Sequence, residues 1–180
     1  TATDVDGAAN SFQAQTNVAG ANNYGTFSMT TAGVWTYTMN SAQNQFVKDQ
    51  TYTDSFTVAA ADGTTKQVTV TITGTNDAAV ISSTGSTGAL TESDIAQSTT
   101  GTLTATDVDG AANSFQAQTN VTGSNGYGKF SLTTAGVWTY TMNSAQNQFV
   151  KDQTYTDSFT VAAADGTTKQ VTVTITGTND

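Results

Sequence analysis

Apolar and polar residues alternate along most of this chain, and threonine fills many of the polar positions. In Val34–Met39, tryptophan, tyrosine and methionine alternate with threonine, and residues 56–60 and 68–73 repeat the pattern with phenylalanine, valine and isoleucine. A period of two with β-branched and aromatic residues predicts β-strands, because successive strand side chains point to opposite faces of a sheet. We therefore expect a chain built of strands.

The breaks between these runs are typical of turns. Asp62-Gly63 separates two alternating runs, which predicts a hairpin because both residues tolerate a positive φ. Residues 79–81 and 102–105 are expected to be strands, joined by a stretch rich in serine, threonine and glycine. About seven short strands per 100 residues favour an all-β fold of antiparallel Ig-like sandwiches.

The chain carries this pattern twice. Residues 1–77 recur as residues 104–180, and only five of the 77 aligned positions differ. The differing pairs are Ala19/Thr122, Ala21/Ser124, Asn23/Gly126, Thr26/Lys129 and Met29/Leu132. Two copies this similar indicate one module that was copied in tandem to build length, so its first predicted partners are neighbouring repeats of the same chain.

The seam between the repeats is expected near residues 74–78, after the last clean strand. In this interpretation residues 78–180 form a complete domain, and residues 1–77 form a copy that lacks its first strands. Periodicity alone also permits the other phase, in which residues 78–103 complete the first copy. A copy without its first strands exposes unpaired strand edges, so strand exchange or self-association of repeat 1 is expected.

Composition excludes several classes of function. Fourteen acids against five lysines give a net charge of -9, which disfavours binding to the phosphates of nucleic acids. Cysteine and histidine are absent, which removes disulfides, thiolate metal sites and the commonest general base. The serines and threonines have no base partner, so we predict that the chain is not an enzyme. No apolar run reaches the roughly 18 residues of a membrane span.

The acids are the candidates for chemistry. Asp4 and Asp6, and again Asp107 and Asp109, stand two residues apart before a glycine. On an extended chain such pairs share a face about 6.5 Å apart, where like charges repel unless a cation lies between them. Hard oxygen ligands select calcium or magnesium, and calcium takes six to eight of them. The further predicted ligands, gathered at a domain junction, are Asn76, Asp77, Asp49, Glu92, Asp152 and Asp180.

Other prominent residues are interpreted as structural. Trp35 and Trp138 fit a buried core position better than a sugar-stacking platform, because they stand in alternating runs. Asp54 and Asp157 are interpreted as surface acids, and Asp62 as a turn residue.

The residues also carry a resemblance. The pattern TLTATDVDG…GVWTYTMN…VTVTITGTND is similar to the VCBS repeats of RTX-type surface adhesins, a bacterial cadherin-like family, over essentially the whole chain. Within it, Asn76-Asp77 resembles the Asn-Asp of the cadherin linker, and Asp107 and Asp109 resemble the cadherin Asp-x-Asp pair. Glu92 resembles the N-terminal glutamate of cadherin domains, and Asp49 resembles the aspartate of their LDRE motif.

Three departures from the cadherin pattern limit what the resemblance implies. Gly74 stands where cadherins have a linker aspartate, Gln50 replaces the motif's glutamate, and Ala78 replaces the final asparagine. One or two calcium ions per junction are therefore expected rather than three.

The resemblance implies an extracellular protein at the bacterial cell surface. In it, tandem cadherin-like β-sandwiches would act as non-catalytic extenders, stiffened by calcium into a rod for cell adhesion or biofilm formation. The alternative is an adhesion module that itself binds a glycan or a protein partner. Exposed aromatic side chains on one face would favour this alternative, and buried Trp35 and Trp138 would favour the extender.

Overall fold

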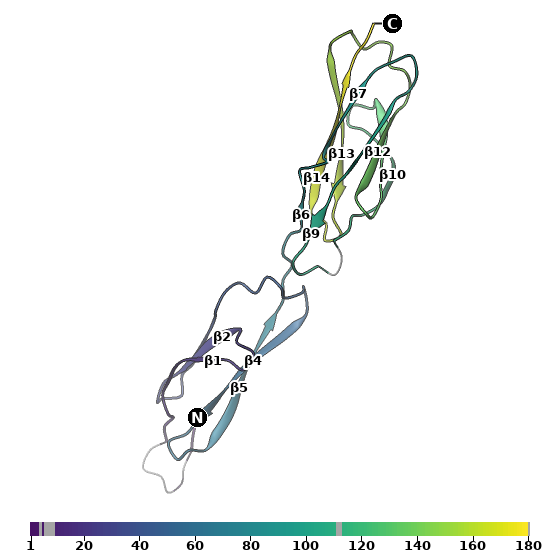
Figure 1. The fold of residues 1–180 in the computed structure, drawn as a ribbon. Coiled ribbons are helices and arrows are strands. Elements are labelled where there is room, and N and C mark those ends of the chain that lie inside the picture. The colour runs from purple at the N-terminus through teal and green to yellow at the C-terminus, as the bar shows by residue number, and fades with distance from the viewer. Residues whose placement is uncertain (4, 6–9, 111–112, 180) are drawn as a thin grey trace. The chain divides into compact units, whose positions relative to one another are not determined.

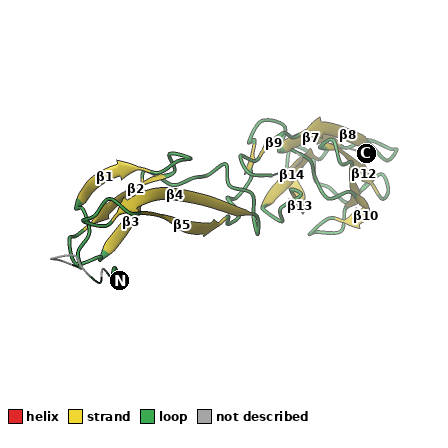
Figure 2. Ribbon diagram, turned by 90° about the horizontal axis from the view of Figure 1, so that it is seen from below, coloured by secondary structure: helices red, strands yellow, loops and turns green. Residues whose placement is uncertain are grey.

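The structure is a computed structural model that describes residues 1–3, 5, 10–110 and 113–179. It divides into two compact units, Thr1–Asn76 (unit 1) and Asp77–Asp180 (unit 2). All the regular elements in the described residues are β-strands (Figures 1 and 2), so the predicted all-β class is confirmed. In this part of the chain, no helix is long and apolar enough to cross a membrane.

Unit 1 contains an antiparallel three-stranded sheet in the order β1-β2-β3 and a separate hairpin, β4-β5. Its strands are β1 (Gln15–Ala19), β2 (Gly25–Met29), β3 (Trp35–Met39), β4 (Thr51–Ala59) and β5 (Thr65–Thr73). The predicted turn closes the hairpin: Gly63 has a φ of +89°, and the carboxylate of Asp62 accepts hydrogen bonds from Thr64. The small core of unit 1 is formed by Phe27, Met29, Phe56 and Val58.

Unit 2 repeats these five strands and adds four more. The repeated strands are β10 (Gln118–Thr122), β11 (Gly128–Leu132), β12 (Val137–Met142), β13 (Thr154–Ala162) and β14 (Thr168–Thr176). The additional strands are β6 (Val80–Ile81), β7 (Thr87–Thr91), β8 (Ser98–Thr102) and β9 (Ala105–Thr106). They produce sheets in the orders β10-β11-β12-β8 and β13-β14-β7, with β6 paired to β9.

One pairing departs from the expected antiparallel sandwich. β7 runs parallel to β14, with Thr87 opposite Thr172 and Thr91 opposite Thr176. The strand that follows β7 in the chain is β8, which lies in the other sheet. β7 and β14 are therefore not joined by a hairpin, the short connection that requires two strands to be antiparallel. The other pairings between described strands are antiparallel.

The core of unit 2 follows the predicted period of two. In β12 the side chains of Trp138, Tyr140 and Met142 are buried, whereas Val137 and the threonines of the opposite parity are exposed. In β14 the valines and the isoleucine are buried, and the threonines between them are more exposed. Seven apolar residues in the runs that alternate with threonine or serine are at most 4% exposed, namely Trp138, Tyr140, Phe159, Val161, Val171, Val173 and Ile175. Two inner faces of apolar side chains therefore pack against each other, as in a β-sandwich.

The stretch between the first strands differs from expectation. Residues 102–105 are not one strand, because β8 ends at Thr102 and β9 begins at Ala105. The Ser/Thr/Gly-rich residues before them contain both β7 and β8, which period-two reasoning did not identify. Their inward side chains are small because they lie against the indole of Trp138: a Cβ on Gly88 or Gly101 would come within 2.7 or 2.6 Å of it.

Candidate functional site

One end of unit 2 brings three predicted ligands together. The backbone N–H of Asp77 donates to the carboxylate of Asp109 at 3.2 Å, and Asp109 is buried. The carboxylate of Asp107 accepts from the backbone of Asp109 at 3.3 Å and of Gly110 at 3.0 Å. The Asp107–Gly110 segment is therefore a turn, and the expectation of an extended chain with both carboxylates on one strand face is wrong.

In this turn, Asp77, Asp107 and Asp109 do not form a complete metal site. Among the described residues, no group of three or more aspartates or glutamates is arranged closely enough to hold a metal ion. Asp4 and Asp6, the counterparts of Asp107 and Asp109, and Asp180, the counterpart of Asp77, lie outside the described residues. The donors present are carboxylate oxygens, which are the ligands that calcium prefers.

Glu92 lies at a different place in unit 2. Its backbone N–H donates to Thr176 at the end of β14, and one carboxylate oxygen, Oε2, accepts from Thr178 N (3.0 Å) and Oγ1 (2.7 Å). The side chain is 1% exposed, and its other oxygen, Oε1, is buried without a hydrogen-bond partner. A buried, unsatisfied carboxylate oxygen is costly, so this atom is a position where a cation would be stabilising.

The same end of the strand also carries Asp152. Its backbone N–H donates to Gly177 at 3.0 Å, next to the Thr178 that Glu92 binds. Asp152 has a positive φ of 63°, and its side chain is exposed. Glu92 and Thr178, with Asp152 joined to the same segment through its backbone N–H, form a second group of polar residues.

The two groups lie at opposite ends of β14. Asp77 and Asp109 are near the beginning of this strand, since Ala79 N donates to Asp165 in the turn that precedes it. Glu92 is bound where β14 ends, and nine extended residues span about 30 Å. Glu92 therefore does not share a site with Asp107 and Asp109 within unit 2.

In unit 1, Asp49 lies beside the residues that leave the last strand. Its N–H donates to the carbonyl of Gly74 at 3.0 Å, and its φ is 61°. A side chain at Gly74 would place a Cβ 2.2 Å from the carbonyl oxygen of Val47, so only glycine fits this approach. This close approach explains why residue 74 is a glycine. Asn76 is exposed, and its role as a ligand together with Asp49 stays a prediction.

Asp54 and Asp157 are not surface acids, so the sequence prediction for these two residues is wrong. Both are completely buried. Asp54 accepts hydrogen bonds from the backbone of Asn22, Tyr24, Gly25 and Ser55 and from the hydroxyl of Tyr37. Burial alone would raise the pKa of Asp54, but these hydrogen bonds outweigh it and hold the pKa below its usual value.

Trp35 and Trp138 have different surroundings, although they occupy the same repeat position. Trp138 is fully buried, and its indole N–H donates to Gly85 at 2.7 Å. Trp35 is 42% exposed, so the prediction that it is a core residue is wrong. The cause is that the residues covering Trp138, which include Gly85, Gly88 and Gly101, have no counterpart in residues 1–76.

Comparison with protein families gives one match. The model of the family described as "Bacterial cadherin-like domain" matches residues 1–74 and 76–177. A search of curated proteins found no match.

Among solved structures, the chain is similar to ectodomains of two cadherin-type proteins. The human desmocollin-1 ectodomain aligns with a TM-score of 0.37 and 15% identity, covering 93% of this chain and 29% of that one. The protocadherin GammaB4 extracellular domain aligns with a TM-score of 0.46 and 14% identity, covering 92% of this chain and 26% of that one. The chain thus spans less than a third of either structure.

Proposed function

The chain belongs to the bacterial cadherin-like domain family, and on that premise we propose that its two units are non-catalytic extender modules of a larger bacterial surface adhesin. The near-identity of the two repeats supports this proposal, because copying one module adds length rather than a second specificity. The finer assignment, to VCBS-type repeats of an extracellular RTX adhesin active in adhesion or biofilm formation, is part of the same proposal. So is the boundary that makes residues 78–180 the complete repeat.

The mechanism that we propose is mechanical and depends on calcium. Calcium would be held at both ends of unit 2, by Asp77, Asp107 and Asp109 at one end and by Glu92 and Asp152 at the other. The ion supplies positive charge to groups of carboxylates that would otherwise repel one another. These residues would bind the ion, and they would hold in place the segments that follow the last strand of each unit.

The observation that carries the proposal is Glu92 Oε1. It is a buried oxygen of an ionisable side chain with no hydrogen-bond partner, while Oε2 of the same carboxylate has two. Proteins rarely leave such an atom unsatisfied, because the loss of hydration is not compensated. A bound cation is the simplest compensation for this atom, with Thr178 beside it and Asp152 joined to the neighbouring Gly177 through its backbone.

A calcium titration of the whole chain tests this function. Calcium binding in extracellular modules has dissociation constants of about 0.1–1 mM. Calcium at 100 times that constant would add about 2.7 kcal/mol to the stability of the folded state. We expect a higher melting temperature in calcium than in chelator. Equal melting temperatures in the two conditions would refute calcium-dependent stiffening.

Two matched variants assign the residues. Glu92→Gln keeps the shape of the side chain but removes its charge, and it should weaken calcium binding at one site. Asp94→Asn removes an exposed charge two residues further along the chain and should leave binding unchanged. If both variants bind calcium as the unmodified chain does, Glu92 is not a ligand.

The alternative, a module that binds a glycan or protein, has less support. It requires an exposed aromatic platform in the complete repeat, and Trp138 is buried there. The exposure of Trp35 results from a missing cover rather than from a different local sequence, because residues 34–39 and 137–142 are identical.

A further inference from the structure

Two segments that are far apart in the sequence of unit 2 run side by side in the same direction. Residues 79–92 contain β6 and β7, and residues 165–178 contain β14. The contacts between the two segments join residues that are 86 positions apart, namely Ala79 with Asp165, Ser83 with Lys169, and Glu92 with Thr178. The parallel arrangement of β7 and β14 therefore continues beyond the two strands in both directions.

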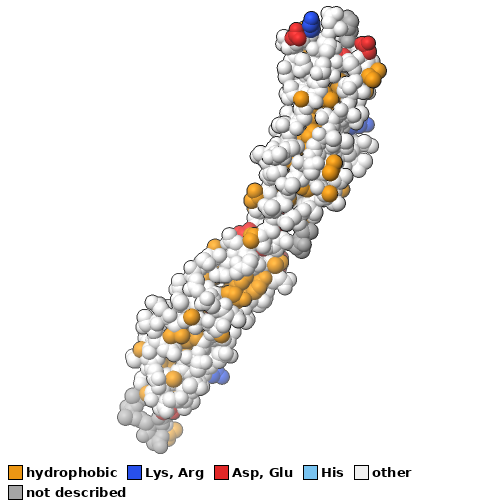
Figure 3. Space-filling view, in the orientation of Figure 1, with side chains coloured by type: hydrophobic (Ala, Val, Ile, Leu, Met, Phe, Trp, Pro, Cys, Tyr) orange, Lys and Arg blue, Asp and Glu red, His pale blue; other side chains and the backbone are white. Residues whose placement is uncertain are grey.

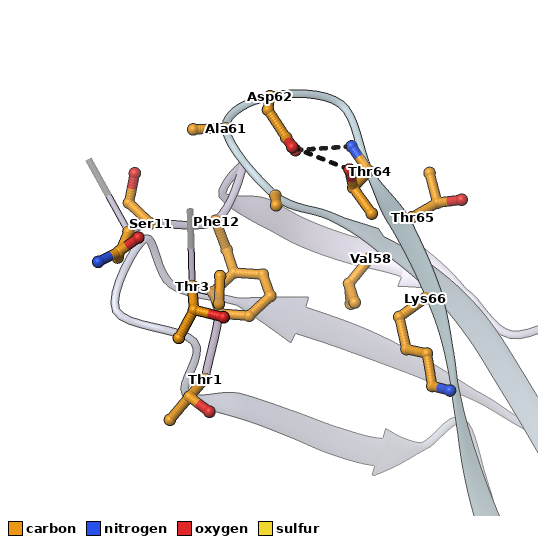
Figure 4. A pocket seen from close by; sticks show the side chains of 13 residues that line it. Thr1, Thr3, Ser11, Phe12, Val58, Ala61, Asp62, Thr64, Thr65 and Lys66 are labelled. Atoms are coloured by element: carbon orange, nitrogen blue, oxygen red, sulfur yellow. Dashed lines mark hydrogen bonds between the residues drawn. The ribbon is translucent and has the colours of Figure 1, made fainter. Parts of the chain in front are cut away.

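At the beginning of β14, the turn between β13 and β14 holds the first segment. The carboxylate of Asp165 accepts from Ala79 N at 3.0 Å and from Thr167 Oγ1 at 2.6 Å. Figure 4 shows the equivalent turn of unit 1, in which the carboxylate of Asp62 binds Thr64 in the same way. The turn's own hydrogen bonds thus keep the carboxylate where it can accept from Ala79.

In the middle, β7 lies against both β14 and the core. β7 and β14 form five residue pairs, and just before them Thr172 N donates to the carbonyl of Ser86 at 3.0 Å. A Cβ on Gly88 would lie 2.7 Å from the indole of Trp138, so β7 has no room to shift towards the core. β7 contains no charged residue, so its pairing with β14 depends on backbone hydrogen bonds and not on ion pairs.

Glu92 closes the pairing at the other end of β14. Its N–H donates to the carbonyl of Thr176 at 2.8 Å, and its carboxylate accepts from Thr178 N at 3.0 Å and from Thr178 Oγ1 at 2.7 Å. On the face shown in Figure 3, acidic side chains of unit 2 gather near the end that carries the C-terminus, and the middle of the unit shows none. Charge therefore enters this pairing at its end, through Glu92.

The shared direction of the two segments decides how a pull on the chain reaches their contacts. Residues 78 and 179 lie at opposite ends of β14, because their neighbours Ala79 and Thr178 are bound there. A pull between these two points draws residues 79–92 and β14 past each other along the strand axis, and it strains all their hydrogen bonds at once. A pull applied at one end of β14 would instead break the bonds one after another.

We propose that the pairing of residues 79–92 with residues 165–178 is the element of unit 2 that resists tension along the chain. Glu92 and Thr178 lock its register, because any slip of β7 along β14 must first separate them. That the protein meets such tension rests on the extender function proposed above. The resistance itself comes from contacts within unit 2 and does not require calcium.

Force spectroscopy on single molecules of the whole chain tests this inference. The chain has no cysteine, so a pair of introduced cysteines sets the two points where the force acts. Ala78→Cys with Asn179→Cys pulls along the pairing, and Asp94→Cys with Asn179→Cys pulls at one end of β14; the three positions are exposed. In chelator, we expect the first pair to require an unfolding force about twofold or more higher than the second, because the unfolding rate governs forced unfolding.

Three substitutions in the chain with Ala78→Cys and Asn179→Cys distinguish resistance to force from overall stability. Thr178→Val removes the hydroxyl that donates to Glu92, and the unfolding rate at constant force should rise about tenfold. Thr178→Ser retains a hydroxyl and should restore the slow rate. Val161→Ala, in the core side of β13, should lower the melting temperature but leave this rate nearly unchanged, because Val161 stays packed while β7 separates from β14.

Equal unfolding forces in the two pulling geometries would overturn the proposal. If Thr178→Ser unfolds as fast as Thr178→Val, or if only Val161→Ala changes the rate, Glu92 and Thr178 are not the lock. The result also separates this inference from the calcium mechanism. A chain that does not bind calcium but resists the first geometry more strongly keeps the inference, whereas a chain that binds calcium and unfolds at equal forces refutes it.

Discussion

The hydroxyl of Tyr140 donates a hydrogen bond of 3.1 Å to the buried carboxylate of Asp157. The same carboxylate accepts from the backbone of Asn125, Tyr127, Gly128 and Ser158. It stands so close to Gly123 that a Cβ there would lie 2.1 Å from it. One aspartate therefore connects the β10–β11 turn, β12 and β13, and Tyr37 and Asp54 repeat the arrangement in unit 1 at 3.1 Å.

Replacing Asp157 by alanine should strongly destabilise unit 2. The substitution leaves several buried N–H groups and one hydroxyl without an acceptor, and each unsatisfied group costs about 1–3 kcal/mol. We expect a loss of about 3 kcal/mol or more in the free energy of unfolding, measured by denaturant titration. Asp94→Ala, at an exposed acid, is the control and should change the stability by less than about 0.5 kcal/mol. A similarly small effect for Asp157→Ala would contradict this role.

Stability should also depend on pH at both extremes. The pKa of Asp54 is lower in the folded state than in the unfolded chain, so its contribution is present above pH ~4 and is lost as the pH falls through the folded value. Burial, followed by the hydrogen bond to Asp54, raises the pKa of Tyr37 to about 12. Its contribution is complete below pH ~10 and is lost as the pH rises towards 12.

Thermal melting as a function of pH checks these directions. Asp54→Asn should flatten the acid side of the profile, and Tyr37→Phe should flatten the alkaline side. An unchanged profile in Asp54→Asn would show that another carboxylate controls acid unfolding.

Much of the fold was predictable from local pattern. Alternation identified β12 and β14 and their buried residues, since apolar side chains of one parity face the same core. The strands β7 and β8 were not predictable this way, because their inward positions at Gly88 and Gly101 are set by the volume of Trp138, which is distant in sequence.

The candidate site was predictable only in its chemistry. The acids were singled out as oxygen donors, but their grouping depends on which strand ends they occupy, and that requires the parallel pairing of β7 with β14. Asp54 and Asp157 gave no local signal of burial, because their partners are mainly backbone N–H groups of a turn about 30 residues away.

Gly177 should be intolerant of any side chain. A Cβ there would lie 2.3 Å from the carbonyl oxygen of Val150, which is backbone and cannot move aside like a side chain. We expect Gly177→Ala to destabilise unit 2 by about 1–3 kcal/mol and to disturb the loop at Asp152. Gly126→Asn is the control, because unit 1 already has Asn23 at that position with a φ of 57°. Equal stability of the two variants would argue against the close approach.

The two tryptophans should respond differently to the same substitution. Trp138→Phe loses a buried indole and its hydrogen bond to Gly85, which should cost about 2 kcal/mol or more. Trp35→Phe changes a side chain that is 42% exposed and should cost less than about 1 kcal/mol. Each variant retains one tryptophan, so its emission during unfolding also reports the stability of a single unit. Equal losses would indicate that Trp35 is covered in solution.

Calcium should stiffen the connection between the units, and the two ends of unit 2 provide an internal control. Asp77 belongs to the segment after β5, and its N–H donates to Asp109, so calcium bound there would restrain the connecting segment. Glu92 lies at the other end of β14, where calcium would restrain only the residues beyond Thr178. Small-angle scattering of the whole chain should therefore show less flexibility in calcium than in chelator.

The variants separate these two effects. Asp107→Asn with Asp109→Asn should abolish the response of the scattering to calcium, because they remove the charges beside the connecting segment. Glu92→Gln should leave that response intact while it lowers the melting temperature in calcium. If the scattering in calcium and chelator is the same for the unmodified chain, calcium does not stiffen the connection. If Glu92→Gln instead abolishes the scattering response, the two groups of acids do not act independently as their positions along β14 require.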